Sequence, residues 1–190
     1  IIGNPNPDFT IGLNNTFSYK NFDLTLYLTG SYGAEILNYS RVQIEGQTTI
    51  FGNQARTVDN RVRYGLKNPT GSDLDPANVV LANPDAALPR PTTTDNNRNT
   101  RMSDRFIEDG SYTRIQNIRL GYTFPTQMLQ KFRVQKLRLY VNAQNVYTIT
   151  NYSGYDPEIG AFNQDPLLQN VDMGRYPTPR VITFGLDVDF

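Results

Sequence analysis

Any chemistry in this chain would have to come from carboxylates and basic side chains, because its 190 residues include no cysteine and no histidine. Thiolate nucleophiles, disulfides, the usual zinc ligands and the commonest general base are therefore excluded. The acids Asp156 and Glu158 flank Pro157. Two acids in a loop more often form a solvated turn, and no histidine or cysteine is available to partner them. The sequence predicts no catalytic residue, no enzyme and no cofactor.

The same loop acids could ligate a hard cation such as calcium, which takes several oxygen ligands. The candidates are Asp156, Glu158 and Asp165, but the chain lacks the alternating aspartates of calcium-binding loops. We therefore predict no metal site, and the question of calcium stays open. Lys and Arg number 18, and so do Asp and Glu, so the net charge is zero. This balance argues against nucleic acid as a partner and against general electrostatic attraction to a membrane surface.

The last ten residues, 181–190, alternate between large apolar side chains and mostly small or acidic ones. A period of two is typical of a β-strand with one apolar and one polar face. Phe190 belongs to the apolar set, whereas the last residues of a soluble domain usually fray. Outer-membrane β-barrels end in this way, so we interpret Phe190 as an assembly signal on a membrane-spanning strand. The apolar positions are Ile182, Phe184, Leu186, Val188 and Phe190.

Similar alternation predicts four further strands. The first two form a hairpin around a turn at Lys20 and Asn21, because asparagine tolerates the positive φ that tight turns need. Most strands have about eleven residues, which suits the ~9–11 residues of a tilted membrane strand better than the ~5–6 of an average soluble one. Ile115 lies out of phase with Ile118, which indicates a β-bulge or a strand that has already left the lipid. The five predicted strands are 9–20, 22–32, 112–124, 136–148 and 180–190.

The connections between these strands alternate between short and long. Residues 33–111 and 149–179 lack alternation and are rich in Asn, Pro and Asp, with a short helix expected around 34–43; residues 125–135 form a short connection with one helical turn. Long extracellular loops and short periplasmic turns are typical of outer-membrane barrels. Aromatic side chains gather at the predicted strand ends, as membrane girdles do. They are Tyr19, Phe22, Tyr122, Phe124 and Phe190 at the periplasmic end, and Phe9, Tyr32 and Tyr147 at the other.

We therefore predict an all-β fold, an antiparallel transmembrane β-barrel segment with two long extracellular loops. Five strands cannot close a barrel, since about eight is the usual minimum, and lipid does not tolerate an open sheet edge. Residues 1–190 are thus expected to be the C-terminal part of a larger barrel. Two other interpretations stay open: a soluble or surface-exposed β-sandwich that binds carbohydrate, and a purely structural barrel fragment.

Several stretches carry a family resemblance. They are Ser103–Pro125, Leu137–Thr150 followed by Tyr155–Glu158, the hairpin Phe9–Tyr32 and the closing Pro179–Phe190. Together they resemble the C-terminal portion of SusC/RagA-type TonB-linked outer-membrane transporters. The resemblance implies a barrel of about 22 strands, of which this chain supplies the last five, with the plug and the N-terminal domains absent. It implies TonB-energised import of glycans or peptides across the outer membrane of a Gram-negative bacterium, under a SusD-like lipoprotein lid.

The resemblance also suggests roles for two sets of side chains. The polar strand face would point into the lumen and pair within itself and with the receptor's own plug, with direct substrate contact as the alternative. Aromatics of the second long loop could stack on sugars or peptide side chains, pack the loop or contact the lid. The lumen-facing set is Arg119, Lys136, Arg138, Tyr140, Asn142, Gln144, Asp187 and Asp189; the loop set is Tyr152, Tyr155, Phe162 and Tyr176. Membrane lipid and TonB, the latter through the absent N-terminal part, complete the expected partners.

Overall fold

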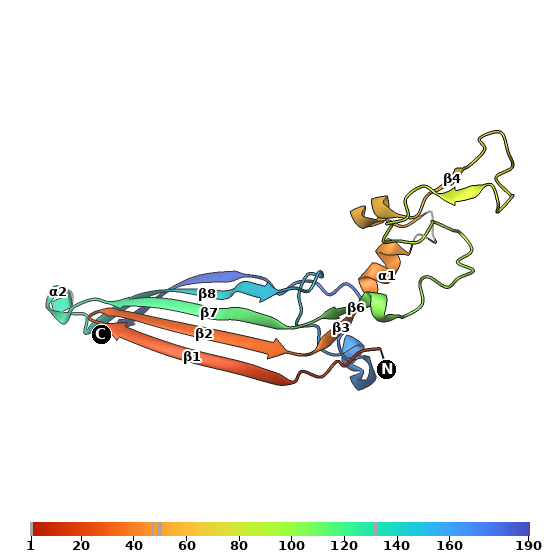
Figure 1. Ribbon diagram of the computed structural model, residues 1–190. Helices are drawn as coiled ribbons and strands as arrows, with labels where there is room; N and C mark the ends of the chain where they lie inside the picture. The colour runs from red at the N-terminus through yellow and green to blue at the C-terminus, as the bar shows by residue number, and fades with distance from the viewer. Residues whose placement is uncertain (1, 47, 49–50, 131–132) are drawn as a thin grey trace. The chain divides into compact units, whose positions relative to one another are not determined.

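The computed structural model describes residues 2–46, 48, 51–130 and 133–190. The chain divides into two compact units, one formed by the residues up to 37 together with 107–190, the other by residues 38–106. Most of the first unit is one five-stranded antiparallel sheet (Figure 1). Its strands, in their hydrogen-bonded order, are β1 Phe9–Tyr19, β2 Phe22–Tyr32, β7 Tyr112–Thr123, β8 Lys136–Thr150 and β10 Val181–Asp189.

These strands lie within one or two residues of the five segments that alternation predicts. β1 and β2 form the expected hairpin, with Tyr19 opposite Phe22. In the hairpin turn the residue with positive φ is Lys20, at 53°. The sequence predicts positive φ at Asn21 instead, and this detail is wrong. One lysine can adopt this conformation at a cost of ~1–2 kcal/mol.

A β-bulge in the middle of β7 is confirmed. The register with β2 passes from Tyr27 opposite Asn117 to Leu28 opposite Ile115, so Gln116 is the extra residue. An extra residue on one strand reverses the alternation beyond it. Ile115 and Ile118 therefore face the same side of the sheet although their sequence spacing is odd. β8 has its own irregularity at the same level.

One face of the five-stranded sheet is apolar and uncovered. Phe184 and Leu186 are 80% and 57% exposed, and many apolar side chains of the other four strands are exposed as well. A β-sandwich would bury this face against a second sheet, so that alternative is wrong. Aromatic pairs stand at both ends of the face, Phe22–Tyr122 at one and Phe9–Tyr32 at the other. In the described part of the chain no helix is long and apolar enough to cross a membrane.

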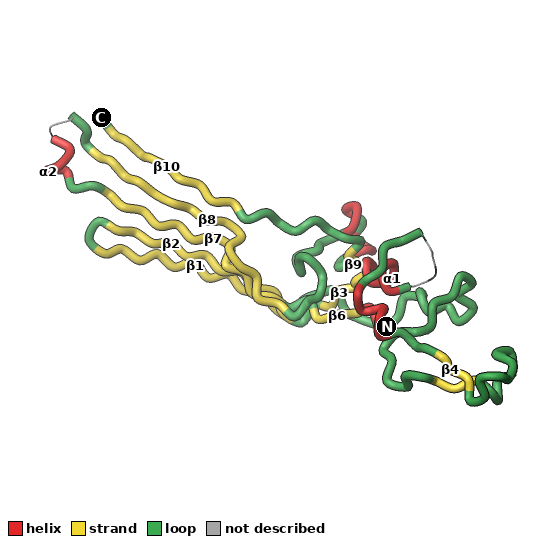
Figure 2. Tube along the Cα trace, turned by 90° about the horizontal axis from the view of Figure 1, so that it is seen from above, coloured by secondary structure: helices red, strands yellow, loops and turns green. Residues whose placement is uncertain are grey.

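The two ends of the sheet differ. Figure 2 shows α2 (Thr126–Leu129) and the C-terminus at one end, and a small second sheet at the other. That small sheet contains β3 Glu35–Asn38, β6 Ile107–Asp109 and β9 Val171–Asp172, in the order β6-β3-β9. Its buried residues include Ile36, which packs with Tyr152 and Ile159 of loop 151–179. The second long loop is therefore built onto the end of the sheet, with short 3₁₀ turns at 162–164 and 166–168.

The short helix expected around residues 34–43 is displaced. The chain first forms β3 and only then α1, Tyr39–Glu45, which begins after Asn38 because the Asn38 side chain accepts a hydrogen bond from the Arg41 backbone nitrogen. The rest of the second unit holds a 3₁₀ turn at Arg56–Asn60, the pair β4 Tyr64–Leu66 and β5 Val79–Leu81, and a 3₁₀ turn at Asp104–Phe106.

The second unit buries a charged side chain as well as apolar residues such as Val42 and Phe106. Glu45 is 4% exposed, and its carboxylate accepts hydrogen bonds from Arg41, Arg105 and Thr57. A buried charge is tolerated when it is paired in this way. The segment that lacks any strand pattern is therefore not structureless, because polar contacts organise it.

Candidate functional site

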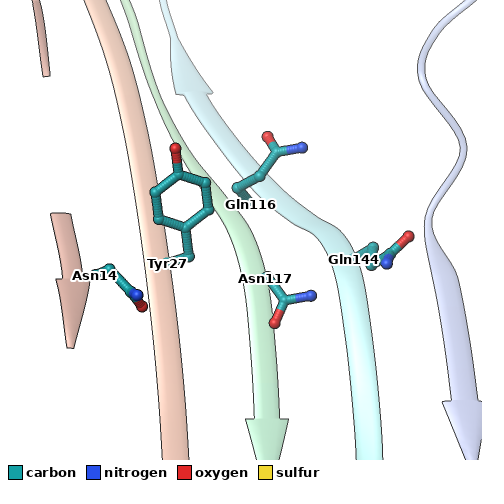
Figure 3. Close-up of a pocket in the computed structure, with 5 residues that line it drawn as sticks. All are labelled: Asn14, Tyr27, Gln116, Asn117 and Gln144. Atoms are coloured by element: carbon teal, nitrogen blue, oxygen red, sulfur yellow. The ribbon is translucent and has the colours of Figure 1, made fainter. Parts of the chain in front are cut away.

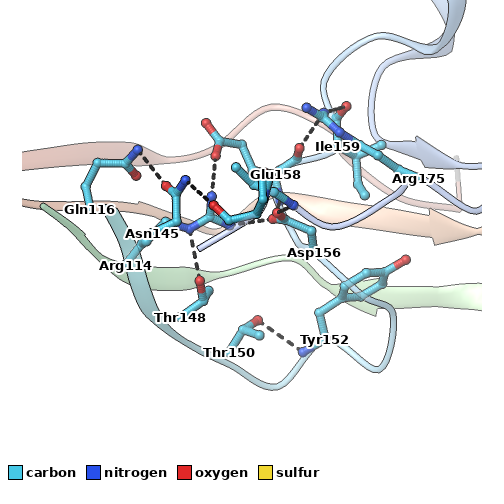
Figure 4. Close-up of polar contacts among 12 residues, drawn as sticks. Arg114, Gln116, Asn145, Thr148, Thr150, Tyr152, Asp156, Glu158, Ile159 and Arg175 are labelled. Carbon is cyan, nitrogen blue, oxygen red and sulfur yellow. Dashed lines mark hydrogen bonds and ion pairs between the residues drawn. The ribbon is translucent and has the colours of Figure 1, made fainter. Parts of the chain in front are cut away.

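A buried arginine joins the second long loop to the sheet. Arg114 lies on the polar face of β7 and is 2% exposed. Its guanidinium donates to Asp156 Oδ1 at 2.5 Å, to Glu158 Oε2 at 2.9 Å and, through Nε, to Thr148 Oγ1 at 2.9 Å. Figure 4 shows Glu158 above the arginine, Asp156 beside it and Thr148 of β8 below it. One charged side chain therefore connects two neighbouring strands with a loop some forty residues further on.

The two acids of this anchor differ in burial. The Asp156 side chain is 5% exposed, while that of Glu158 is 54% exposed. Burial by itself raises the pKa of Asp156, but hydrogen bonds from the Glu158 backbone, from Thr178 and from Arg114 outweigh it and hold that pKa below its ordinary value. Asp156 is thus ionised at neutral pH, as an ion pair with Arg114 requires.

Further polar contacts fix the shape of the loop. The Tyr152 hydroxyl donates to Asp172 Oδ2 at 2.5 Å, and both residues are buried. The other carboxylate oxygen, Oδ1, accepts from the backbone nitrogens of Gly174 and Arg175, which closes the chain after β9. The Arg175 guanidinium in turn donates to the backbone carbonyls of Glu158 and Ile159. Loop 151–179 therefore has a defined fold that its own polar contacts stabilise.

The loop aromatics do not all occupy the same kind of place. Tyr155 and Tyr176 are 80% and 84% exposed, and Phe162 is half-buried beside a hollow of about 420 Å³ that Met173 also lines. Tyr152 is only 6% exposed. Its ring packs in the loop core and its hydroxyl is bound to Asp172. The prediction that Tyr152 contacts a substrate or a lid therefore needs correction, because this residue holds the loop together.

The polar face of the sheet carries an ion-pair network near its α2 end. Arg138 donates to both carboxylate oxygens of Asp23, at 3.1 and 2.6 Å, and to Asp187 at 3.1 Å. The Arg119 guanidinium lies 4.0 Å from the centre of the Tyr140 ring. This ring lies over Gly185, where a Cβ atom would overlap the ring, so the close approach requires glycine.

All the residues predicted to face the lumen lie on this polar face. In the register Lys136 is opposite Asp189, Arg138 opposite Asp187, Asn142 opposite Thr183 and Gln144 opposite Val181. The structure brings Arg119, Arg138, Tyr140 and Asp187 together with Asp23. Asn142 is directly opposite Arg119, and Gln144 lies one step further along the sheet, opposite Asn117.

Sequence reasoning missed the anchor. The sequence pattern indicates no role for Arg114 or Thr148, and it favours a solvated turn for Asp156 and Glu158. A signal was present, since a lone arginine lies on the polar face near a strand end and the loop that follows the next strand carries two acids. Pairing across 42 residues, however, follows only from the fold.

The described residues show no group of three or more Asp, Glu, His or Cys side chains that could hold a metal ion. Asp156 and Glu158 are both engaged by Arg114, and Asp165 caps the 3₁₀ turn at 166–168 through its hydrogen bond from the Leu167 nitrogen. The calcium candidates are therefore used as ion-pair and capping groups, and what the cluster can do chemically is to hold a loop in place.

We expect loop 151–179 to loosen in acid. Because the folded-state pKa of Asp156 is lowered, its stabilisation is complete above the ordinary pKa of aspartate and is lost as the pH falls through the lower, folded-state value. Hydrogen exchange of loop amides, corrected for intrinsic rate, should be constant between about pH 7 and pH 5 and should rise below about pH 3. The amides of β2 should remain protected; equal loosening of both segments would show that the anchor is not the acid-sensitive element.

Comparison with known proteins gives consistent relatives over the whole chain. No family model matches the sequence. TonB-dependent receptor P3 of Formosa agariphila is 37% identical over 194 residues, which is 100% of this chain and 17% of that protein. TonB-dependent receptor P26 of the same organism is 30% identical over 193 residues, 100% of this chain and 18% of that protein. TonB-dependent receptor SusC of Bacteroides thetaiotaomicron is 28% identical over 196 residues, 98% of this chain and 15% of that protein.

The fold is also known. A structure of the RagAB peptide transporter superposes with a TM-score of 0.72 at 20% identity, covering 97% of this chain and 17% of that chain. A structure of the RagAB peptide importer in a closed state gives a TM-score of 0.68 at 21% identity, covering 100% of this chain and 18% of that chain. The chain therefore spans less than one fifth of the length of each of these proteins.

Proposed function

Since this chain belongs to the SusC/RagA type of TonB-dependent receptors, which reside in the outer membrane of Gram-negative bacteria, we propose that it is part of the barrel wall of a TonB-energised importer of glycans or peptides. The rest of the protein would supply the remaining wall strands, a plug and the segment that binds TonB. In this proposal the chain itself has no enzymatic activity, binds no cofactor and contacts no nucleic acid.

One observation carries the proposal: a sheet of membrane-spanning length with one uncovered apolar face. Four of its five strands have 11 to 15 residues and β10 has nine, and about 9–11 residues cross a bilayer at a tilt. Exposed apolar patches of this size are rare on soluble monomers. On this basis the apolar face meets lipid, and Phe190, which directly follows β10 and is 82% exposed, acts as the assembly signal.

The polar face would then line the lumen. Arg138 is paired with two acids, and Arg119 is stacked on Tyr140. The Arg138 network suits contact with a folded plug, because paired charges can be covered without leaving a buried charge unmatched. The residues proposed to face the lumen are Arg119, Lys136, Arg138, Tyr140, Asn142, Gln144, Asp187 and Asp189.

The long segments would lie outside the cell, 33–111 and 149–179 being the extracellular loops. We assign contact with a SusD-like surface lipoprotein, or with the solute, to Tyr155, Phe162 and Tyr176. The two tyrosines are largely exposed, and they stand on a loop that the Arg114 anchor holds in place. Exposed tyrosines on a rigid support are typical anchors of recognition surfaces.

The proposal is tested with the full-length receptor in a strain that lacks its own copy. Uptake of glycan and peptide pools should require the receptor and a functional TonB. The double variant Tyr155→Ala/Tyr176→Ala should lower uptake by about tenfold or more, the effect of losing one or two interface anchors. Leu167→Ala, which replaces an 89% exposed apolar residue of the same loop, is the matched control and should change little. Uptake that does not depend on the receptor would refute the importer; equal uptake by both variants would refute the role of the two tyrosines.

A further inference from the structure

A single row of uncharged polar side chains crosses the polar face half-way along the sheet. Asn14 is opposite Tyr27, Tyr27 opposite Asn117, and Asn117 opposite Gln144. The row therefore contains one residue from each of four neighbouring strands. Together with Gln116 these side chains line a hollow of about 500 Å³ (Figure 3). We call these five residues the amide row.

The β-bulge builds this row. Without an extra residue in β7, Asn117 would be followed on the polar face by residue 115, and Ile115 would stand among polar groups. The bulge at Gln116 turns Ile115 back to the apolar face and leaves two consecutive amides, Gln116 and Asn117, on the polar side. Bulges often re-aim side chains next to functional sites.

Most of the amide row has no hydrogen-bond partner within the described residues. Gln116 donates to Asn145 Oδ1 at 3.0 Å. In the described part of the chain the side chains of Asn14, Tyr27, Asn117 and Gln144 form no hydrogen bond. Each primary amide offers both donors and an acceptor, so the row presents a series of unused groups of both kinds.

The charges near the amide row indicate which class of ligand it could bind. Arg114, two residues beyond the bulge, is paired with two acids. Arg119, on the other side of the row, is stacked on Tyr140, and its Nε is buried without a hydrogen-bond partner among the described residues. The row itself carries no charge, so an ionised ligand would lose hydration there without gaining a partner. The complementary ligand is neutral and rich in groups that both donate and accept.

Tyr27 adds a flat apolar surface to this row. Its side chain lies between Asn14 and Asn117, and adjacent strands are ~4.8 Å apart. The residue is 38% exposed. Gly12 of β1 lies beside the ring and places no side chain against it; a Cβ atom there would be 3.8 Å from the Tyr27 hydroxyl, an ordinary contact distance. A ring face with amides on both sides matches a sugar ring, which has an apolar C–H face surrounded by hydroxyls.

We propose that the amide row is a subsite for a neutral oligosaccharide passing along the barrel wall. This inference rests on the proposed importer function and adds a place and a ligand class to it. Tyr27 packs against a sugar ring, and the amides of Asn14, Asn117 and Gln144 hydrogen-bond its hydroxyls. A peptide is the less suitable occupant, since its charged side chains would meet a row without ionised partners.

The test is protection of single cysteines in the full-length receptor, in a background without other cysteines. Asn14→Cys and Gln144→Cys place a thiol at either end of the row, and Ser18→Cys, on the same face of β1 but outside the row, is the control. The probes are a pool of neutral oligosaccharides, a pool of acidic oligosaccharides and a pool of neutral peptides. At ten times its dissociation constant a ligand should slow maleimide labelling about tenfold.

Protection of the Asn14→Cys and Gln144→Cys variants by the neutral oligosaccharide pool alone, with the Ser18→Cys variant unaffected, supports the subsite. Protection by the peptide pool or by the acidic pool, equal protection of the Ser18→Cys control, or no protection by any pool overturns it. Uptake of the same three pools is measured in the same cells. If a pool is imported but does not protect the cysteines of the row, the importer function stands and only the subsite is refuted. If no pool is imported, the importer function itself is refuted.

Discussion

Replacing Arg114 with leucine should release loop 151–179 from the end of the sheet while leaving the sheet intact. The substitution leaves the buried carboxylate of Asp156 without its cationic partner, and breaking one side of a buried ion pair typically costs ~3–5 kcal/mol. The cost falls on the loop, because the five strands keep their own backbone hydrogen bonds. Hydrogen exchange of loop amides in the assembled receptor should rise by about two orders of magnitude or more, with β2 and β7 unchanged.

Two further variants separate the ion pair from simple loss of packing. Arg180→Leu removes an exposed arginine that lines, together with Arg114, a hollow at the base of the loop, and it should change the stability of the loop by less than about 0.5 kcal/mol. Arg114→Leu/Asp156→Leu removes both charges and should recover part of the loss, because no ionised group is then left buried without a partner. A double variant as loose as Arg114→Leu would mean that the arginine acts through its bulk and not through its charge.

The sequence predicts the large sheet well because lipid imposes the strongest pattern that a strand can carry. One face must be apolar at every second residue, so β1, β2 and β10 are visible from alternation alone. Even the β7 bulge leaves a trace, since Ile115 and Ile118 are out of phase. Hairpin register follows from the turn, with Tyr19 opposite Phe22.

The loops are less predictable because their order comes from contacts between distant residues. Arg114 and Asp156, Glu45 and Arg105, and Tyr152 and Ile36 are each paired through the fold. No periodic pattern in the local sequence predicts such pairs. Tyr152 shows the consequence: an aromatic residue in a polar loop has the same composition signal whether it is presented to a partner or, as here, buried with its hydroxyl on Asp172.

The membrane assignment makes the second large prediction, for which two adjacent residues of β2 serve as test and control. Leu26 lies on the apolar face, opposite Asn15 and Ile118 near the middle of the strand, and Thr25 lies beside it on the polar face, opposite Thr16 and Arg119. Leu26→Lys should cost ~2–4 kcal/mol in a bilayer, since a lysine at mid-depth has no water to reach. Thr25→Lys should be tolerated better, because its charge stays on the polar face and away from lipid.

The same cost is expected for Leu186→Lys on β10, which is an edge strand of the same sheet. Leu186 is 57% exposed. The measurement is the fraction of full-length receptor that reaches its assembled, heat-modifiable form in the outer membrane. Leu26→Lys and Leu186→Lys should lower that fraction strongly, and Thr25→Lys should not. If both apolar-face variants assemble as well as Thr25→Lys, this face does not meet hydrocarbon, and the importer proposal would lose the physical observation on which it depends, whatever relatives the sequence has.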